Sequence, residues 1–346
     1  MEKIVVGLSG GVDSAVAALL LQREGYEVVG VTLRVHNEAD AELADAAKIA
    51  DKLGIEHRIT DMTRPFADVV ISYFADAYEN GRTPNPCLVC NPKIKWQALL
   101  SVADEVGAKL VATGHYAGIR KLENGRYAIS CAASQAKDQA YVLYGLTQEQ
   151  LQRTVMPLTS YEKDTVRQIA ENVGIPVAHK ADSMEICFLP EGISYADYII
   201  QRTGQVPQAG NFVDEDGKVL GRHKGVLYYT VGQRKGLGIA FGEPRYVKRL
   251  DAEKNEVILS DGDALFQKTV YMKDYLGMAC EEPQDGDCFL GKVRYSHKGD
   301  TCRVYREKDL FRCEFDRPQR APTPGQALVL YREDCVAGGG IIVAEP

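Results

Sequence analysis

Residues 4–14 read Ile-Val-Val-Gly-Leu-Ser-Gly-Gly-Val-Asp-Ser, and a helical segment rich in Ala and Leu, residues 14–24, follows at once. The apolar residues predict a strand, and Gly-Gly predicts a tight turn into the helix. A strand, a turn and a helix N-terminus together form an anion site, because unpaired backbone N–H groups and the positive end of the helix dipole meet there. The stretch therefore predicts an α/β fold with a phosphate group bound at the start of its first helix.

The residue types in the turn strengthen the prediction of a phosphate site. Gly10 and Gly11 let the backbone approach a phosphate without a Cβ in the way, and the hydroxyls of Ser9 and Ser14 add donors. The carboxylate of Asp13 is suited to hold Mg²⁺ on the phosphates. The turn is not a Walker A loop, since no Gly-Lys-Ser/Thr follows, and it lacks the Gly-x-Gly-x-x-Gly spacing of dinucleotide sites.

Up to about residue 200, short apolar strands alternate with helical segments, a pattern typical of a mostly parallel sheet covered by helices. Asn124-Gly125 predicts a hairpin turn. The expected strands are 3–8, 27–34, 56–60 and 109–114, and the expected helices are 14–24, 39–53, 65–79, 93–106, 147–154 and 162–173.

Beyond residue 205 the helical patterns vanish, and turn signals such as Asp216-Gly217 and Asp261-Gly262 separate short alternating strands. This change favours two small all-β domains after the α/β domain. We therefore expect three domains, at 1–204, 205–272 and 273–346.

The bulk composition is that of an ordinary globular protein, with 45% hydrophobic and 26% charged residues in a chain of 346. No apolar run approaches the ~20 residues of a membrane helix, so we expect no membrane partner. Nine cysteines, an odd number without a recognisable leader segment, favour a reducing compartment over a disulfide framework. We therefore expect the protein in the cytoplasm.

The net charge is −7, yet the segment 221–250 is basic and carries a single acid, Glu243. A basic segment on an acidic protein suits a polyanion such as a nucleic acid, although it equally fits a solvated face. Its basic residues are Arg222, Lys224, Arg234, Lys235, Arg245, Lys248 and Arg249, and the aromatic residues between them are Tyr228, Tyr229, Phe241 and Tyr246.

Three cysteines stand among Pro, Asn, Asp and Glu, namely Cys87, Cys90 and Cys187. The first two form a Cys-x-x-Cys pair on a predicted loop before the helix expected at 93–106, where a helix N-terminus lowers a thiol pKa. Such a pair fits a redox dithiol, half of a zinc site or half of an iron–sulfur site. The other six cysteines lie in apolar or strand-like contexts and are expected to be small buried residues.

Polar residues also follow the predicted strand 109–114, at the edge where open α/β sheets bind ligands. His115 comes directly after a glycine at the end of this strand and is a candidate ligand contact. The triplet Lys137-Asp138-Gln139 precedes an aromatic-rich helical segment and fits either a ligand contact or a surface helix cap.

Seven motifs stand in one order along nearly the whole chain, and this order resembles that of the tRNA-specific 2-thiouridylases. Members of this family carry a pyrophosphatase loop and put sulfur on C2 of the wobble uridine of tRNA. The motifs are Gly-Leu-Ser-Gly-Gly-Val-Asp-Ser (7–14), Gly-Arg-Thr-Pro-Asn-Pro-x-x-x-Cys-Asn (81–91), Ala-Thr-Gly-His-Tyr (112–116), Lys-Asp-Gln (137–139), Asp-Ser-x-x-Ile-Cys-Phe (182–188), Thr-Val-Gly-Gln-Arg-Lys-Gly-Leu-Gly-Ile (230–239) and Gly-Gly-Gly-Ile-Ile (338–342).

The resemblance implies an ATP-dependent reaction. ATP adenylates the C2 oxygen of the uridine, sulfur delivered at Cys187 and Cys90 attacks C2, and AMP and pyrophosphate are released. Cys187 would carry a persulfide, and Cys90 would resolve the reaction through a disulfide with Cys187. The implied nucleotide-binding residues are Gly7, Leu8, Ser9, Gly10, Gly11, Val12, Asp13, Ser14, Leu33 and Gly114.

The resemblance also implies partners and roles for the domains. Residues 1–204 would be a catalytic domain of the adenine nucleotide α-hydrolase-like fold, 205–272 a central tRNA-binding domain holding the basic segment, and 273–346 a β-barrel. The partners would be tRNA and a sulfur donor, either a persulfide carrier protein or inorganic sulfide. The implied tRNA contacts are Asn85, Pro86, Cys87, His115, Lys137, Asp138, Gln139, Arg294, Tyr295 and Gln326.

Two departures from the family pattern stand out. Cys87 occupies the position at which the commonest pattern has aspartate, and the segment 33–38 lacks the usual aromatic and acidic insertion. We hypothesise that Cys87, Cys90 and Cys187 hold a [4Fe–4S] cluster through three of its irons, with the fourth iron open to sulfide. The rival hypotheses are persulfide chemistry with Cys87 as a bystander, and a zinc site.

Two other functions fit part of the sequence. An ATP-dependent ligase or amidotransferase would use the same loop with ammonia or an amine, and it would not need the three cysteines. A non-catalytic RNA-binding module with structural zinc would release no pyrophosphate and would unfold on chelation.

Overall fold

The structure is a computed structural model, and it describes residues 1–37, 39–180, 186–190, 192–239 and 242–346. Phe241 of the basic segment and Asp182 and Ser183 of the motif before Cys187 lie outside the described residues. Within the described part of the chain, no helix is long and apolar enough to cross a membrane.

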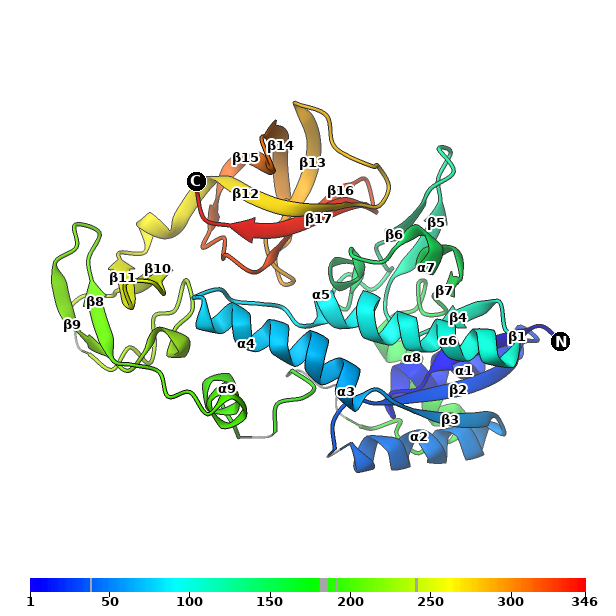
Figure 1. Cartoon of the computed structure of the whole chain (residues 1–346). Coiled ribbons are helices and arrows are strands. Elements are labelled where there is room, and N and C mark those ends of the chain that lie inside the picture. The colour runs from blue at the N-terminus through cyan, green and yellow to red at the C-terminus, as the bar shows by residue number, and fades with distance from the viewer. Residues whose placement is uncertain (38, 181–185, 191, 240–241) are drawn as a thin grey trace.

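A five-stranded parallel sheet forms the N-terminal domain, in the order β3-β2-β1-β4-β7. Alternate residues of its central strand point to opposite faces: Ile4 and Val6 pack with α1 (Val12–Arg23), while Val5 packs with α6 (Trp96–Val106). The expected α/β architecture is confirmed (Figure 1). Its strands are β1 (Lys3–Gly7), β2 (Glu27–Arg34), β3 (Glu56–Asp61), β4 (Leu110–Ala112) and β7 (Thr154–Val155).

The helices lie close to the expected ranges, with one difference that matters for the site. The helix expected at 93–106 begins at Cys87, because α5 (Cys87–Cys90) and a π turn (Asn91–Lys95) run directly into α6. Pro92 has no N–H to donate, and the wider π turn accommodates it without ending the helix. The remaining helices are α2 (Asp40–Leu53), α3 (Thr63–Phe66), a π turn (Ala67–Ile71), α4 (Ser72–Glu79), α7 (Gln148–Gln152), α8 (Lys163–Val173) and α9 (Tyr195–Thr203).

Two β units follow, as the sequence predicts. The first is a four-stranded sheet in the order β10-β11-β8-β9, and the second is a six-stranded barrel that closes because β12 pairs with both β15 and β17 (Figure 1). Their strands are β8 (Gly210–Val213), β9 (Val219–His223), β10 (Tyr246–Asp251), β11 (Glu256–Ser260), β12 (Phe266–Gly277), β13 (Asp287–Lys292), β14 (Asp300–Glu307), β15 (Leu310–Arg320), β16 (Ala327–Arg332) and β17 (Cys335–Val343).

The barrel is joined to the N-terminal domain by a hairpin. Strands β5 (Gly118–Lys121) and β6 (Tyr127–Ser130) flank the predicted Asn124-Gly125 turn, and Ser130 pairs with Cys335 of β17. Arg126 on this hairpin donates to the backbone carbonyls of Met278 at 2.7 Å and Gly277 at 2.9 Å. The domain boundary expected at 272/273 falls inside β12, and the predicted domain limits otherwise stay predictions.

Candidate active site

The predicted phosphate loop links β1 to α1 at the carboxyl edge of the sheet. Gly10 has a φ of +72°, and a Cβ there would lie 2.6 Å from the carbonyl oxygen of Glu42, so this position requires glycine. The Ser14 hydroxyl donates to the Gly11 carbonyl at 3.0 Å and accepts the Ser9 N–H at 3.2 Å. No side chain caps the N-terminus of α1, which leaves its first N–H groups facing a ligand.

The segment after β4 closes against this loop. A Cβ on Gly114 would lie 2.6 Å from the backbone nitrogen of Ser14, so Gly114 packs directly on the first turn of α1. Leu33 lies near the end of β2, the strand that pairs with β1. All the expected nucleotide-binding residues thus lie around one edge of the sheet, at the strand ends where open α/β folds bind ligands.

Asp13 has partners that the sequence did not reveal. Its two carboxylate oxygens lie 2.8 and 2.9 Å from the Lys163 ammonium, and the Tyr116 hydroxyl donates to one of them at 2.7 Å. The Lys163 side chain is only 11% exposed. Lys163 and Tyr116 thus fix the position of the Asp13 carboxylate, and its expected role as a Mg²⁺ ligand stays a prediction.

The three singled-out cysteines lie near one another. Cys90 packs on an apolar cluster that also contacts Ile186, the residue before Cys187. Negative charge on Cys87 raises the pKa of both Cys90 and Cys187, so the three thiols are within electrostatic reach of each other. The structure therefore brings together two motifs that stand about a hundred residues apart in the sequence.

The expected lowering of the thiol pKa at the helix start is wrong. Burial raises the pKa of Cys90 to about 12. Cys87 and Cys187 reach the surface, but the surrounding protein displaces water from their thiols, and this desolvation raises the pKa of both. Desolvation outweighs the helix N-terminus here because the thiols sit beside an apolar cluster.

A metal ligand set does not form from these thiols. Among the described residues, no three His, Cys, Asp or Glu side chains are arranged to hold a metal ion. Cys87, Cys90 and Cys187 share a neighbourhood without converging as ligands, so the residues do not fit an iron–sulfur cluster or a zinc ion in this arrangement.

Lys95, a residue that the sequence reading missed, faces the thiols from the π turn. Its positive charge lowers the pKa of Cys87, Cys90 and Cys187 against the larger effect of desolvation. The ammonium lies 3.5 Å from Nε2 of His115, the residue after Gly114. His115 therefore connects the nucleotide loop to the thiols, and its expected place in the site is supported by this contact.

Comparison with known proteins follows the same three-part organisation. A tRNA methyl transferase HUP domain model matches residues 2–191, a tRNA methyl transferase PRC-barrel domain model matches 197–261, and an aminomethyltransferase beta-barrel domain model matches 268–342. The tRNA-specific 2-thiouridylase MnmA of Lachnoclostridium phytofermentans is 46% identical over 99% of this chain and 100% of its own length. That of Clostridioides difficile is 42% identical over 99% and 98%. The chain belongs to the tRNA-specific 2-thiouridylase family.

Solved structures resemble the chain more weakly. The U34-tRNA thiolase NcsA from Methanococcus maripaludis with its [4Fe–4S] cluster is 18% identical, with a TM-score of 0.37 over 59% of this chain and 65% of its own. NMN synthetase from Francisella tularensis is 19% identical, with a TM-score of 0.34 over 53% and 66%. Likenesses at this level carry no argument about the chemistry of this 2-thiouridylase family member.

Two residues that are expected to contact tRNA make hydrogen bonds within the protein, and their tRNA contacts stay predictions. The amide of Gln326 donates to the Thr83 carbonyl at 2.8 Å, and Gln139 accepts the Tyr116 N–H at 2.9 Å. Each of these two side chains thus connects two segments of the fold by a hydrogen bond.

Asp138, Asn85 and Pro86 also make contacts within the protein. Asp138 accepts the Ala132 N–H at 2.9 Å, and burial raises the pKa of its carboxyl. Asn85 accepts the Cys87 N–H at 3.1 Å, and Pro86 is the buried N-cap of α5. These contacts shape the turn that presents Cys87.

Other expected tRNA residues are better placed to meet a substrate. Tyr295 on the barrel is 45% exposed. Desolvation raises the pKa of its hydroxyl, and the negative charges of Asp138 and Cys87 raise that pKa further. Its ring packs edge-on against Tyr141 at 6.2 Å. Arg294 and Lys137 are half-buried, and Arg294 donates to the Arg320 carbonyl at 2.9 Å. Tyr295 on the barrel therefore lies within electrostatic reach of Cys87.

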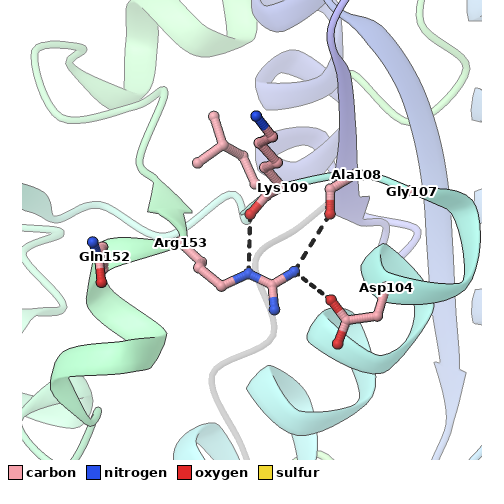
Figure 2. A pocket seen from close by; sticks show the side chains of 7 residues that line it. Asp104, Gly107, Ala108, Lys109, Gln152 and Arg153 are labelled. Atoms are coloured by element: carbon pink, nitrogen blue, oxygen red, sulfur yellow. Dashed lines mark hydrogen bonds and ion pairs between the residues drawn. The ribbon is translucent and has the colours of Figure 1, made fainter.

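A hollow at the opposite edge of the sheet contains none of the expected site residues. Figure 2 shows it between α6 and α7, where Arg153 donates to Asp104 at 2.7 Å and to the Lys109 carbonyl at 3.0 Å. Nε and Nη2 of Arg153 thus connect α7 to the end of α6 and to the chain just before β4.

Proposed function

We propose that this chain catalyses ATP-dependent 2-thiolation of the wobble uridine of tRNA. The observation that carries the proposal is the continuity between the nucleotide loop and the thiols: Gly114 packs on the loop, His115 follows it, and Lys95 joins His115 to the thiol neighbourhood. Family membership supplies the substrate class, since the whole-chain relatives are named tRNA-specific 2-thiouridylases.

The first step is adenylation of the base. The C2 oxygen of the uridine attacks the α-phosphorus of ATP, the bond to the β-phosphate oxygen breaks, and pyrophosphate leaves. Residues Gly7 to Ser14, with Leu33 and Gly114, hold the nucleotide, and the free N–H groups of α1 stabilise phosphate charge. Lys163 and Tyr116 hold the Asp13 carboxylate beside this loop, and no step is assigned to Mg²⁺.

The second step is attack by sulfur. The terminal sulfur of a persulfide on Cys187 attacks C2, and AMP leaves with the C2 oxygen. The Cys90 thiol then attacks the Cys187 sulfur, which frees the 2-thiouridine and leaves a Cys90–Cys187 disulfide that an external dithiol reduces with two electrons. Proximity of the two thiols supports this assignment. If hydrosulfide is the donor, it attacks C2 directly and loses its proton.

Serine variants of the two cysteines test this proposal. With a persulfide donor, we expect Cys90→Ser and Cys187→Ser to lower 2-thiouridine formation by about 1,000-fold or more, because each removes a sulfur that must form a bond on that route. Affinity for tRNA should stay within about twofold, since the basic segment is untouched. Nucleoside mass spectrometry and filter binding measure the two quantities.

Cys288→Ser is the matched control, because Cys288 is an exposed cysteine on the barrel strand β13. It should thiolate at the wild-type rate. Either serine variant forming 2-thiouridine at that rate would refute the assignment of its cysteine.

The [4Fe–4S] cluster stays a prediction of the Cys87-x-x-Cys90 pattern. It requires the thiolates of Cys87, Cys90 and Cys187 to converge on three irons, and the described residues form no such ligand group. No step of the proposed reaction is therefore assigned to a cluster.

A further inference from the structure

The ammonium of Lys95 has a neutral neighbour where a carboxylate would be expected. In the parts of the chain that the structure describes, no Asp or Glu oxygen lies within ion-pair distance of its Nζ, and the side chain is half-buried. A charge removed from bulk water in this way is stabilised by a hydrogen-bond acceptor and by any anion that can reach it.

The hydrogen-bond directions show that His115 accepts a hydrogen bond from the Lys95 ammonium but carries no negative charge to neutralise it. An ammonium can only donate, so Nε2 of His115 accepts from Lys95 at 3.5 Å. Nδ1–H of the same ring then donates to the Thr113 hydroxyl at 2.8 Å, which in turn points at the Met156 sulfur at 3.8 Å. Burial and the adjacent ammonium push the pKa of His115 well below its usual value, so the ring stays neutral.

The Lys95 ammonium also lies within electrostatic reach of the three thiols, where the proposed reaction delivers sulfur. Lys95 stands five residues after Cys90 on the same continuous helical segment, and its charge acts on the thiols of Cys87, Cys90 and Cys187. The π turn carries a second lysine, Lys93, which is exposed. One lysine of the pair thus faces the thiols and the other faces solvent.

We propose that Lys95, held by neutral His115, binds an anionic sulfur beside the three thiols, either a hydrosulfide ion or the terminal sulfur of a persulfide. The assignment of the anion as sulfur rests on the proposed function. The anion site itself rests on the uncompensated ammonium and its fixed position.

Paired alkylating reagents test the anion site without ATP or tRNA. Iodoacetate is an anion and iodoacetamide is neutral, and the same thiolate attacks the methylene carbon of either reagent and displaces iodide. The ratio of their rates at each cysteine therefore cancels the thiolate fraction and reports the attraction of an anion. In Lys95→Met we expect the iodoacetate-to-iodoacetamide ratio at Cys87, Cys90 or Cys187 to fall about 3- to 10-fold, as the loss of one nearby charge predicts.

Two further variants make this measurement specific. Lys95→Arg keeps the charge and should keep the ratio within about twofold, and Lys93→Met removes an exposed charge from the same turn and should leave it unchanged. Site-resolved mass spectrometry gives the rates, and thermal melting confirms that each variant is folded. An unchanged ratio in folded Lys95→Met would overturn the proposal.

Thiolation kinetics then identify the anion. With sulfide as donor, a KM for sulfide about tenfold higher in Lys95→Met identifies hydrosulfide, while slower transfer from a persulfide donor at unchanged KM identifies the persulfide. Weaker tRNA binding, with a salt slope reduced by about one and an unchanged alkylation ratio, would assign Lys95 to a tRNA phosphate and refute the proposal. Wild-type protein that forms no 2-thiouridine would refute the proposed function, yet the alkylation ratio would still decide the anion site.

Discussion

Asp13 and Lys163 form the most buried ion pair at the nucleotide loop, although 150 residues separate them in the chain. Asp13 could be assigned to a phosphate loop from the residues next to it in the sequence. Nothing in the sequence pointed to Lys163, because an ion pair between distant segments leaves no periodicity or spacing to read. Lys95 was missed for a related reason, since its meaning depends on His115 and Cys187, which come from two other segments of the chain.

Asp13→Ala should stop adenylation while sparing tRNA binding. The substitution removes the carboxylate that Lys163 and Tyr116 contact, so the first turn of α1 loses the group that fixes it against α8. A displaced loop misplaces the α-phosphorus, and we expect pyrophosphate release to fall about 100-fold. A coupled pyrophosphate assay measures the rate, and filter binding measures tRNA affinity.

Asp164→Ala is the control for this prediction. Asp164 is exposed and follows Lys163 on α8, so its loss removes a carboxylate from the same helix turn without touching the loop. Unchanged pyrophosphate release in Asp13→Ala would show that the pair with Lys163 does not support adenylation.

Elements were predictable where their signal is local. The strands at 3–8, 27–34 and 56–60 carry continuous apolar or alternating patterns, and the structure confirms them within one or two residues. The start of the helix at Cys87 was not predictable in the same way, because Pro92 argues for a break and only the π turn around it keeps the helix continuous. That continuity carries Cys87, Cys90 and Lys95 on one rigid segment.

The close approach of β4 to α1 predicts the effect of a single methyl group. Gly114→Ala would place a Cβ 2.6 Å from the Ser14 nitrogen and 2.7 Å from the Asp13 carbonyl carbon, so the helix start must move. We expect ATP-dependent pyrophosphate release to fall about 100-fold, with tRNA affinity retained.

Gly145→Ala is the matched control, because a Cβ there meets its nearest atoms at 3.6 Å, an ordinary contact. Pyrophosphate release at the wild-type rate in Gly114→Ala would mean that the loop tolerates the shift and that its position does not limit adenylation.

At the scale of the whole molecule, the composition and the order of motifs predicted three units and the family, and both are confirmed. The C-terminal barrel that the resemblance implied is also confirmed, whereas its pairing with β6 was beyond the sequence, because strand partners far apart in the chain leave no local signal. The same holds for the thiol neighbourhood, which needs α5, the segment around Cys187 and the barrel residue Tyr295 in place.

Iron content tests the cluster hypothesis on the intact chain. The hypothesis predicts about four irons and acid-labile sulfide per chain after anaerobic purification, both lost in Cys87→Ala. Elemental analysis and an absorbance spectrum measure them, and Cys288→Ala serves as the exposed-cysteine control. Iron-free protein that thiolates tRNA from a persulfide donor, with Cys87→Ala equally active, would contradict the cluster.

Because of the β5–β6 hairpin, the C-terminal segment 266–346 is not a complete module by itself. Strand β17 finds a neighbour in residues 118–130, and Arg126 ties the far end of β12 to the same hairpin. A chimera that exchanges only residues 266–346 between relatives would combine a barrel and a hairpin from different proteins and would disrupt these contacts. A chimera that also exchanges residues 118–130 would keep them. The unit that can be transplanted is therefore discontinuous in the gene, and recombination that respects domain order alone would miss it.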